Sequence, residues 1–323
     1  MGYAAILAEK VVTGGSITKE EAAALYGQPL DDVCENADAI RRHFCGNQFD
    51  LCTIVNAKSG RCSENCKFCA QSSHHETCVE EYPILSVGRL VDRATANQAA
   101  GVLRYSLVTS GKRLSEREID ELCIATRQIK QEVGISVCLS VGLLNERQYR
   151  KLKEAGATRV HNNLETSRRN FPKICTTHTF DEKVQAIKAA QAAGLSVCSG
   201  GIMGLGETVE DRIDMAFSLR ALGVKSVPIN LLNPIPGTPL EHNARLTHDE
   251  MRRIVAVYRF ILPDAAIRLA GGRGLLADHG EGCFRSGANA AITGDMLTTA
   301  GITIKTDQSL MRRLGFERKL DHE

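Results

Sequence analysis

The sequence lacks a long hydrophobic run. No stretch of its 323 residues approaches the ~18 consecutive apolar residues that a membrane-spanning helix needs. The N-terminus lacks the apolar segment of a secretory signal peptide. Because the formal net charge is only +2, electrostatics give no reason to expect a nucleic-acid partner. These absences predict a cytoplasmic protein that binds neither membrane nor nucleic acid.

Linker-like and low-complexity stretches are absent as well, so nothing in the composition divides the chain. The length suits one barrel-sized domain as well as two ordinary ones. Twelve cysteines in 323 residues are too dilute for the disulfide framework of a small secreted domain. Reduced thiols that are free to bind metal are the better interpretation.

What is present is a regular alternation of strand-like and helix-like segments. Short apolar or β-branched runs occur at 51–57, 102–109, 135–142, 157–164, 195–203, 226–232, 265–271 and 290–293. Helix-like segments lie between them at 113–133, 145–155, 181–193, 208–222 and 247–261. Eight strands that alternate with helices predict parallel β/α units, and eight such units can close into a barrel.

The predicted fold is therefore α/β, a (β/α)8 TIM-type barrel with an N-terminal helical extension. The extension covers residues 1–50, where Thr18 and Glu21 have the spacing of a capping box. The barrel covers 51–302, and a C-terminal tail at 303–323 is expected to pack on it.

Residue alternation within the strands predicts what the barrel contains. Strand side chains alternate between two faces, and small, polar or thiol side chains share the face opposite the large apolar ones. This pattern places Cys52, Arg104, Ser106, Cys138 and Cys198 in the lumen. A single such cysteine is most simply a small buried apolar residue. Two on matching faces of separate strands favour a second metal cluster, in place of the usual aliphatic filling of a barrel.

A C-x3-C-x2-C triad formed by Cys62, Cys66 and Cys69 follows the first strand. Three thiolates can hold three corners of a four-iron cluster, which leaves one iron without a protein ligand and open to chemistry. The alternative is a zinc knuckle completed by a nearby side chain. The candidates for that fourth ligand are His74, His75 and Cys78.

The stretch from Asn56 through the triad to Ser72 resembles the cluster loop of the biotin synthase family of radical S-adenosylmethionine (SAM) enzymes. Further stretches resemble that family in the same order, at 163–167, 198–208, 226–230, 237–240 and 268–273. The resemblance covers roughly residues 45–317. The triad alone indicates radical SAM chemistry, whereas the ordered set is specific to this family.

The resemblance implies that dethiobiotin is converted to biotin by radical sulfur insertion. A [4Fe–4S] cluster at the triad would bind and cleave SAM, and an auxiliary iron-sulfur cluster would supply the sulfur. An enclosed barrel would protect the carbon radicals from side reactions. The resemblance further implies a flavodoxin- or ferredoxin-like electron donor and a homodimer.

Residue roles also follow from the resemblance, position by position. SAM contacts are expected from Phe68, Arg104, Glu165, Lys183, Gly200, Gly201 and Glu207. Contacts to dethiobiotin are expected from Lys58, Asn163 and Asn230.

The chain departs from the better-known members at Ser106, where they place an auxiliary-cluster cysteine on the second strand. We therefore expect a relocated ligand set of Cys52, Cys138 and Cys198, holding a two-iron cluster or a four-iron cluster with an extra sulfide. The fourth ligand is expected from Cys45, Cys175 or Arg273. Strand alternation favours Arg268 as the lumen arginine, but the resemblance favours Arg273, and Arg273 is the prediction.

Two other functions remain open from the sequence. Another radical SAM barrel enzyme, of the hydrogenase-maturase or methylornithine-synthase kind, would share the triad. It would lack the motifs at 226–230 and 268–273. A non-catalytic iron-sulfur scaffold would have no use for a polar lumen.

Overall fold

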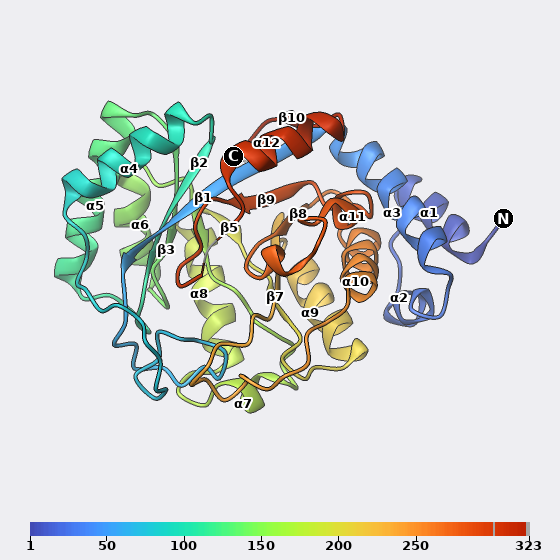
Figure 1. Ribbon diagram of the computed structural model, residues 1–323, viewed down its shortest axis with the longest axis horizontal. Helices are drawn as coiled ribbons and strands as arrows, with labels where there is room; N and C mark the ends of the chain where they lie inside the picture. The colour runs from blue at the N-terminus through green and yellow to red at the C-terminus, as the bar shows by residue number, and fades with distance from the viewer. Residues whose placement is uncertain (300, 321–323) are drawn as a thin grey trace.

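A closed barrel of parallel strands forms the centre of the computed structural model, which describes residues 1–299 and 301–320 (Figure 1). Its strands are β1 (Gln48–Lys58), β2 (Arg104–Thr109), β3 (Ser136–Ser140), β4 (Arg159–His161), β5 (Ser196–Cys198), β7 (Ser226–Leu231), β8 (Ala266–Leu269) and β9 (Ala290–Thr293). Each strand pairs in parallel with the next, and β9 pairs with β1 to close the ring. The predicted (β/α)8 barrel is confirmed.

The strand predicted at 195–203 is divided by a bend. β5 ends at Cys198, and β6 (Gly201–Met203) then pairs with β7. Between them, Gly200 lies against β7 so closely that a Cβ atom would stand 1.9 Å from the carbonyl oxygen of Pro228. Glycine is required at this close backbone approach, and the bend carries the chain toward the mouth of the barrel.

Helices cover the outside of the barrel, and hydroxyl or amide side chains cap most of them. They are α4 (Val87–Ala99), α5 (Glu116–Glu132), α6 (Glu146–Glu154), α8 (Phe180–Ala192), α9 (Val209–Ala221) and α10 (His248–Ile261). Capping boxes begin α5, α6, α8, α9 and α10. Because such a cap satisfies the free N–H groups of the first turn, it fixes where each helix begins.

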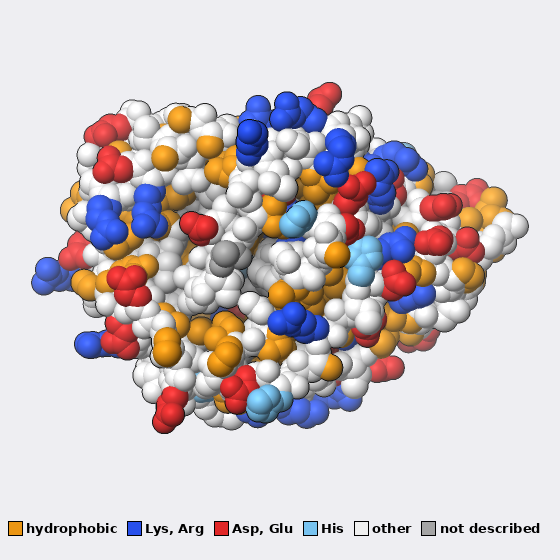
Figure 2. All heavy atoms as spheres, in the orientation of Figure 1, with side chains coloured by type: hydrophobic (Ala, Val, Ile, Leu, Met, Phe, Trp, Pro, Cys, Tyr) orange, Lys and Arg blue, Asp and Glu red, His pale blue; other side chains and the backbone are white. Residues whose placement is uncertain are grey.

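The N-terminal helices and the described part of the C-terminal segment also pack on the barrel. The N-terminal helices are α1 (Tyr3–Val12), α2 (Lys19–Leu25) and α3 (Leu30–Cys45), and Thr18 and Glu21 form the predicted capping box. Near the other end lie η1 (Arg273–Leu275), α11 (Glu281–Phe284), α12 (Ile304–Arg313) and β10 (Glu317–Arg318), which pairs with the start of β1. Lysine and arginine side chains gather over α12 in Figure 2, while both signs of charge mix elsewhere on that face. No described helix is long and apolar enough to cross a bilayer.

The two faces of the strands differ as the alternation predicts. Val137 and Leu139 of β3 belong to the apolar core between the strands and the helices. Cys138, between them, lines the central cavity. Three arginine side chains at the floor of the barrel, Arg104, Arg159 and Arg268, each form an ion pair with Asp50. The lumen is therefore polar at its floor, and its open end lies where the strands end.

Candidate active site

The cysteine triad occupies the loop after β1, at the carboxyl end of the strands, where barrel enzymes place their active sites. The amide of Cys62 donates to the carbonyl of Gln71 at 3.0 Å, and the amide of Cys69 donates to the carbonyl of Cys66 at 3.0 Å. All three thiols are partly exposed and unpaired, and they line one cavity. Three thiols on one short loop fit a [4Fe–4S] cluster that keeps one iron open toward the cavity.

The candidate fourth zinc ligands do not join the triad. The Nε2 atom of His74 lies 3.0 Å from the carbonyl oxygen of Ser63, and that of His75 lies 3.0 Å from the carbonyl oxygen of Cys66. The thiol of Cys78 is exposed. The described residues thus give no support to the zinc-knuckle alternative.

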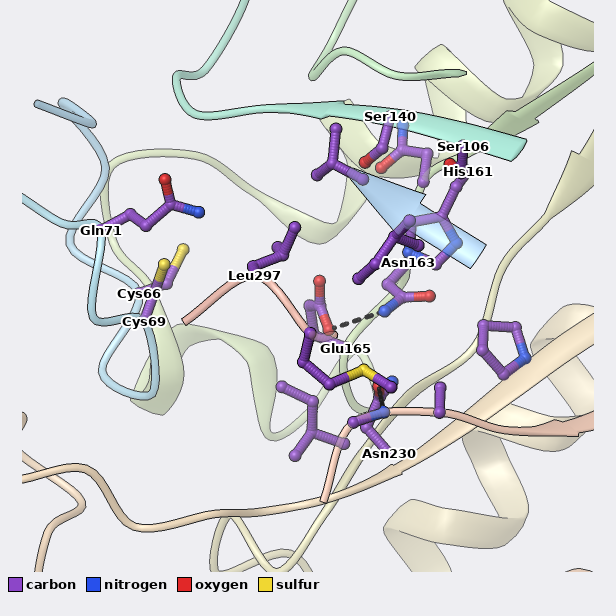
Figure 3. Close-up of a pocket in the computed structure, with 18 of the residues that line it drawn as sticks. Cys66, Cys69, Gln71, Ser106, Ser140, His161, Asn163, Glu165, Asn230 and Leu297 are labelled. Atoms are coloured by element: carbon purple, nitrogen blue, oxygen red, sulfur yellow. Dashed lines mark hydrogen bonds between the residues drawn. The ribbon is translucent and has the colours of Figure 1, made fainter. Parts of the chain in front are cut away.

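The cavity extends from the triad into the barrel and has a volume of about 410 Å3. Figure 3 shows Cys66 and Cys69 on one side and Ser106, Ser140 and His161 on the other. Asn163, Glu165, Asn230 and Leu297 lie between these two sides. One enclosed volume therefore connects the triad with the thiols of the lumen.

Three of the predicted auxiliary ligands lie together in the lumen, namely Cys52, Cys138 and Cys198, all buried. Ser106 stands beside Cys138 in the register of β2 and β3. The Oγ of Ser226 donates to the Sγ of Cys198 at 3.2 Å. The alternation of side chains along the strands is therefore sufficient to predict that these three thiols face the lumen.

The pKa values of the lumen thiols diverge because their neighbours differ. Burial raises the pKa of Cys138 to about 12. Burial also raises the pKa of Cys198, but a hydrogen bond and positive charge from His161, together with Arg268 and Arg159, outweigh it and bring the pKa to about 6. Cys198 is therefore the lumen thiol most readily held as a thiolate.

The arginine that lines the lumen is Arg268. The prediction that Arg273 occupies this place is wrong. Nη1 of Arg268 donates to the Sγ of Cys52 at 3.2 Å, and its Nη2 lies 3.0 Å from a carboxylate oxygen of Asp50. Arg273 lies outside the barrel cavity, where its guanidinium binds Asp307 at 2.5 Å and 2.7 Å. β8 ends at Leu269, and the chain then turns at Gly272, where φ is 77°. The strand alternation is broken there, but the turn carries Arg273 out of the cavity and not into it.

The two other predicted fourth ligands also lie elsewhere. The Sγ of Cys45 faces the carbonyls of Pro263 and Ala265, outside the cavity. Cys175, at the end of α7 (Phe171–Ile174), lies beside Cys66 of the triad. Neither cysteine joins the lumen thiols. Cys45 precedes β1 and Cys175 follows β4, so strand alternation does not predict where either side chain points.

Three of the residues expected to contact SAM do line the cavity near the triad: Phe68, Glu165 and Lys183. Glu165 adopts a left-handed backbone with φ of 70°, which is unusual for a residue with a side chain. The Nζ of Lys183 donates to the Oδ1 of Asn162 at 3.3 Å. A carboxylate and an ammonium group thus line the same cavity as the triad.

The other expected SAM contacts are placed differently. Gly200 and Gly201 do not line the cavity, and their missing Cβ atoms make room for the backbones of Pro228 and Glu165. Glu207 accepts from the amide of Gly204 at 2.9 Å and pairs with Arg212, so it stabilises its own loop. Arg104 does line the cavity, but at the floor, where it pairs with Asp50.

Two of the three expected substrate residues line the cavity. Asn163 accepts from the amide of Gly200 at 3.0 Å and donates to Glu165 at 3.3 Å. Asn230 donates to the carbonyl of Gly201 at 3.0 Å. Lys58 does not line the cavity, because its Nζ is bound to Glu118 of α5 at 2.7 Å.

Sequence reasoning missed Arg159 and did not give a role to His161. Both line the cavity from β4, and both affect the Cys198 thiol. The parity of the strand at 157–164 was the available signal, since Arg159 and His161 alternate with apolar or amide neighbours. Also missed was the contact between Glu64 and His178, whose atoms lie 2.6 Å apart, because no local pattern joins these two loops.

A parallel barrel with three cysteines on the loop after its first strand defines the class of radical SAM enzymes. The model of the Radical SAM superfamily matches residues 57–219. Solved structures of a methylornithine synthase (TM-score 0.84, 20% identity, 97% of each chain) and of a maturase of the [FeFe]-hydrogenase (TM-score 0.83, 18% identity, 97% of this chain and 74% of that one) share the fold.

A second model, the Biotin and Thiamin Synthesis associated domain, matches residues 228–317. The chain is 57% identical to a biotin synthase of Akkermansia muciniphila over 320 residues, covering 99% of this chain and 100% of the relative. It is 58% identical to a biotin synthase of Brachyspira hyodysenteriae over 98% of this chain and 95% of that relative. The chain belongs to the biotin synthase family. Enzymes of this family use a [4Fe–4S] cluster, SAM and an auxiliary iron-sulfur cluster.

Proposed function

We propose that this chain inserts sulfur into dethiobiotin to form biotin, with SAM bound between the triad and the substrate. The observation that carries the proposal is that one cavity has three thiols at its mouth and three at its floor. When bound at the triad, the [4Fe–4S] cluster supplies the electron that cleaves SAM. Sulfur insertion needs the radical source and the sulfur source on two sides of the substrate, and the cavity offers both.

The residues of the chain have separate tasks in this proposal. Glu165 and Lys183 bind the polar groups of SAM, and Phe68 stands beside the adenine. Asn230 binds the main chain through both its amide nitrogen and its amide oxygen, and Asn163 binds Gly200 and Glu165. These bonds fix the orientation of both amides, whose remaining N–H groups and lone pairs are proposed to bind the substrate. The buried walls exclude water, so a carbon radical meets only the sulfur of the floor.

The auxiliary cluster is proposed to be held by Cys52, Cys138 and Cys198, with Arg268 as the fourth ligand or as a hydrogen-bond donor to the sulfur of Cys52. Arg268 supports this proposal because it already contacts that sulfur at 3.2 Å. Ser106 has no thiolate to offer. A cluster held by these residues would supply sulfide to the substrate carbon radicals, and its ferric iron would take up the one electron released as each C–S bond forms.

We propose three parts for the chain: 1–50 as an extension, 51–302 as the barrel, and 303–323 as a tail. α12 and β10 belong to the tail, and its last three residues lie outside the described part of the chain. The electron donor is proposed to be flavodoxin- or ferredoxin-like, and the active form a homodimer in the cytoplasm. Twelve free cysteines support a reducing compartment.

Anaerobically reconstituted protein, supplied with reductant, SAM and dethiobiotin, tests the function. Formation of both 5′-deoxyadenosine and biotin is the expected result. Deoxyadenosine without biotin would favour a different substrate, as in the methylornithine synthase or hydrogenase maturase that share the fold. If neither product forms, the result would favour the non-catalytic scaffold.

A further inference from the structure

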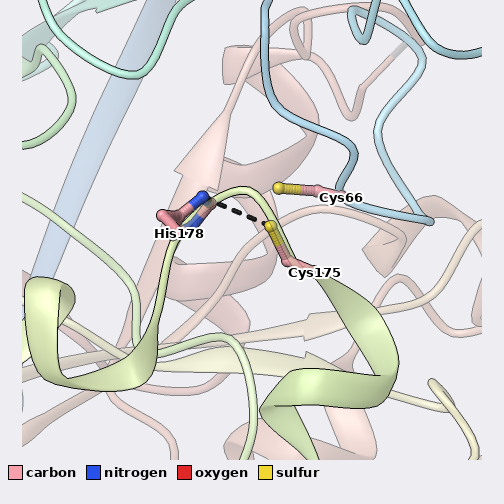
Figure 4. A group of neighbouring side chains, drawn as sticks. All are labelled: Cys66, Cys175 and His178. Atoms are coloured by element: carbon pink, nitrogen blue, oxygen red, sulfur yellow. Dashed lines mark hydrogen bonds between the residues drawn. The ribbon is translucent and has the colours of Figure 1, made fainter.

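A second group of metal-ligating side chains lies beside the triad and shares one residue with it. The ligand atoms of Cys66, Cys175 and His178 all lie within 4.8 Å of one another. Figure 4 shows the sulfur atoms of the two cysteines directed toward each other, with the imidazole of His178 next to them. The Sγ of Cys175 is 3.2 Å from the Nδ1 of His178.

Hydrogen bonds between the two loops hold this group in place. The amide of Lys67 donates to the carbonyl of Ile174 at 3.0 Å. The Oδ1 of Asn65 accepts from the amide of Thr176 at 2.9 Å. These bonds connect the residues that flank Cys66 to the residues that flank Cys175. The two thiols are therefore held close by the backbone positions of their loops, and their proximity does not depend on the side-chain rotamers alone.

The surroundings of Cys66, Cys175 and His178 are those of a cation-binding site. Cys175 and His178 are buried, with 4% and 6% of their surfaces exposed. The carboxylate of Glu64, also buried, lies 2.6 Å from the Nδ1 of His178. Two thiols, an imidazole and a carboxylate therefore converge at one buried place, and these are the side chains that bind metal ions of this class.

Thiolate and imidazole ligands in a tetrahedral arrangement are the set that Zn2+ prefers. With metal–ligand bonds of about 2.0–2.3 Å, the ligand atoms of such a site lie roughly 3.3–3.8 Å apart, a spacing compatible with the 4.8 Å limit here. Two thiolates also neutralise the charge of a divalent ion.

We propose that Cys66, Cys175 and His178 form a mononuclear site for a thiophilic divalent ion, best fitted by Zn2+, in the chain that lacks its [4Fe–4S] cluster. Glu64 or water completes the tetrahedron. Because Cys66 is also a member of the triad, the ion and the cluster exclude each other. The site does not depend on the identity of the substrate.

Zinc bound by the triad itself is the competing explanation, and variants separate the two. Cluster-free protein is prepared anaerobically, and its zinc affinity is measured by competition with a chelator. Cys175→Ser and His178→Asn are expected to weaken zinc binding at least tenfold, while Cys62→Ser and Cys69→Ser retain it. Cys123→Ser, a buried cysteine whose thiol faces Lys151, is the matched control and should bind as the parent does. Circular dichroism shows that each variant is folded.

Substitution with Co2+ gives an independent readout. Thiolate-to-cobalt charge-transfer bands and tetrahedral d–d bands are expected in the parent and in Cys62→Ser, and they should be lost in Cys175→Ser. Loss of zinc from Cys62→Ser and Cys69→Ser, with retention in Cys175→Ser and His178→Asn, would overturn the proposal. Failure of the folded parent to bind zinc would overturn it as well.

Assembly of the [4Fe–4S] cluster tests whether zinc and the cluster exclude each other. One equivalent of Zn2+ per chain is expected to slow reconstitution with iron and sulfide in the parent and in Cys123→Ser. Assembly in Cys175→Ser, which keeps all three cysteines of the triad, should be slowed much less. Equal slowing in the parent and in Cys175→Ser would contradict the shared role of Cys66.

Discussion

At the scale of single residues, two nearby arginines differ in role because their side chains point in different directions. Arg268 and Arg273 are five positions apart and both are buried, yet only Arg268 faces the thiols of the lumen. Arg273 holds Asp307 of α12 against the barrel. One guanidinium therefore lies in the candidate site, and the other attaches the C-terminal segment to the barrel.

Substitution of each arginine by alanine should separate these roles. Arg268→Ala is expected to change the electronic spectrum of the auxiliary cluster or lower its iron content. Arg273→Ala leaves the buried carboxylate of Asp307 without its ion-pair partner, which costs about 3–5 kcal/mol, and so lowers the melting temperature. Iron per folded chain, measured after gel filtration, should remain unchanged in Arg273→Ala. The opposite pattern would restore Arg273 as the lumen arginine.

Cys52 is the residue that the relocated ligand set depends on most. Cys52→Ala should lose most of the auxiliary iron and sulfide and nearly all biotin formation, while deoxyadenosine formation continues at the triad. Iron and sulfide analysis with Mössbauer spectra checks this. Cys123→Ala is the control for removal of a buried thiol. Full auxiliary iron in Cys52→Ala would show that this cysteine is not a ligand.

At the scale of elements, Asp211 links the start of α9 to the loop after β4. Its carboxylate accepts from Ser167 at 2.5 Å and pairs with Arg169 at 2.9 Å. Burial raises the pKa of Asp211, but these hydrogen bonds and the amide of Thr208 outweigh it and lower the pKa to about 2. The position of the loop near Glu165 thus depends on one ionised carboxylate.

The sign of this shift gives a pH-dependent prediction. Because the pKa of Asp211 is lower in the folded chain than in the unfolded one, its ionisation stabilises the fold above about pH 4 and is lost as pH falls toward 2. A pKa of about 2 for Asp211 in the folded chain, below the ordinary value of an aspartate, corresponds to about 2 kcal/mol of stability. Asp211→Asn should therefore destabilise the protein by about 2 kcal/mol at pH 7, and clearly less at pH 3, in urea unfolding. An equal difference at both pH values would show that ionisation is not the cause.

The bend between β5 and β6 provides a second test at this scale. Gly200→Ala would place a Cβ atom 1.9 Å from the carbonyl oxygen of Pro228, so either β7 or the bend must move. A loss of about 1–3 kcal/mol is the expected cost of such overpacking. Gly274→Ala is the matched control, since a Cβ atom there meets nothing within 4 Å. Thermal melts that coincide for both variants would contradict the close approach.

The elements themselves were predictable from the sequence, and several of their contacts were not. Alternation and capping residues are local signals, so the eight strands, five covering helices and the lumen positions of Cys138 and Cys198 follow from them. The proximity of Cys175 to Cys66 depends on how two loops meet across the mouth of the barrel. The pairing of Lys58 with Glu118 depends on how α5 packs, and no spacing in the sequence encodes either contact.

At the scale of the whole molecule, the barrel connects two sets of thiols through one cavity. The triad follows the carboxyl end of β1, whereas the lumen thiols lie within β1 and β3 and at the end of β5. Closure of the barrel by the pairing of β9 with β1 surrounds the cavity that connects them. In the proposed ligand set, Cys52 of β1 replaces the cysteine that the better-known members carry at the position of Ser106. The arrangement is consistent with one chain that both generates the radical and supplies the sulfur.

The most direct test is the origin of the sulfur atom in the product. The protein is reconstituted with heavy-isotope sulfide, freed of unbound sulfide by gel filtration, and supplied anaerobically with reductant, SAM and dethiobiotin for a single turnover. Mass spectrometry of the product should show biotin that carries the heavy sulfur, accompanied by deoxyadenosine. Unlabelled biotin, or deoxyadenosine without any biotin, would contradict the account of a sulfur-donating cluster at the floor of the barrel.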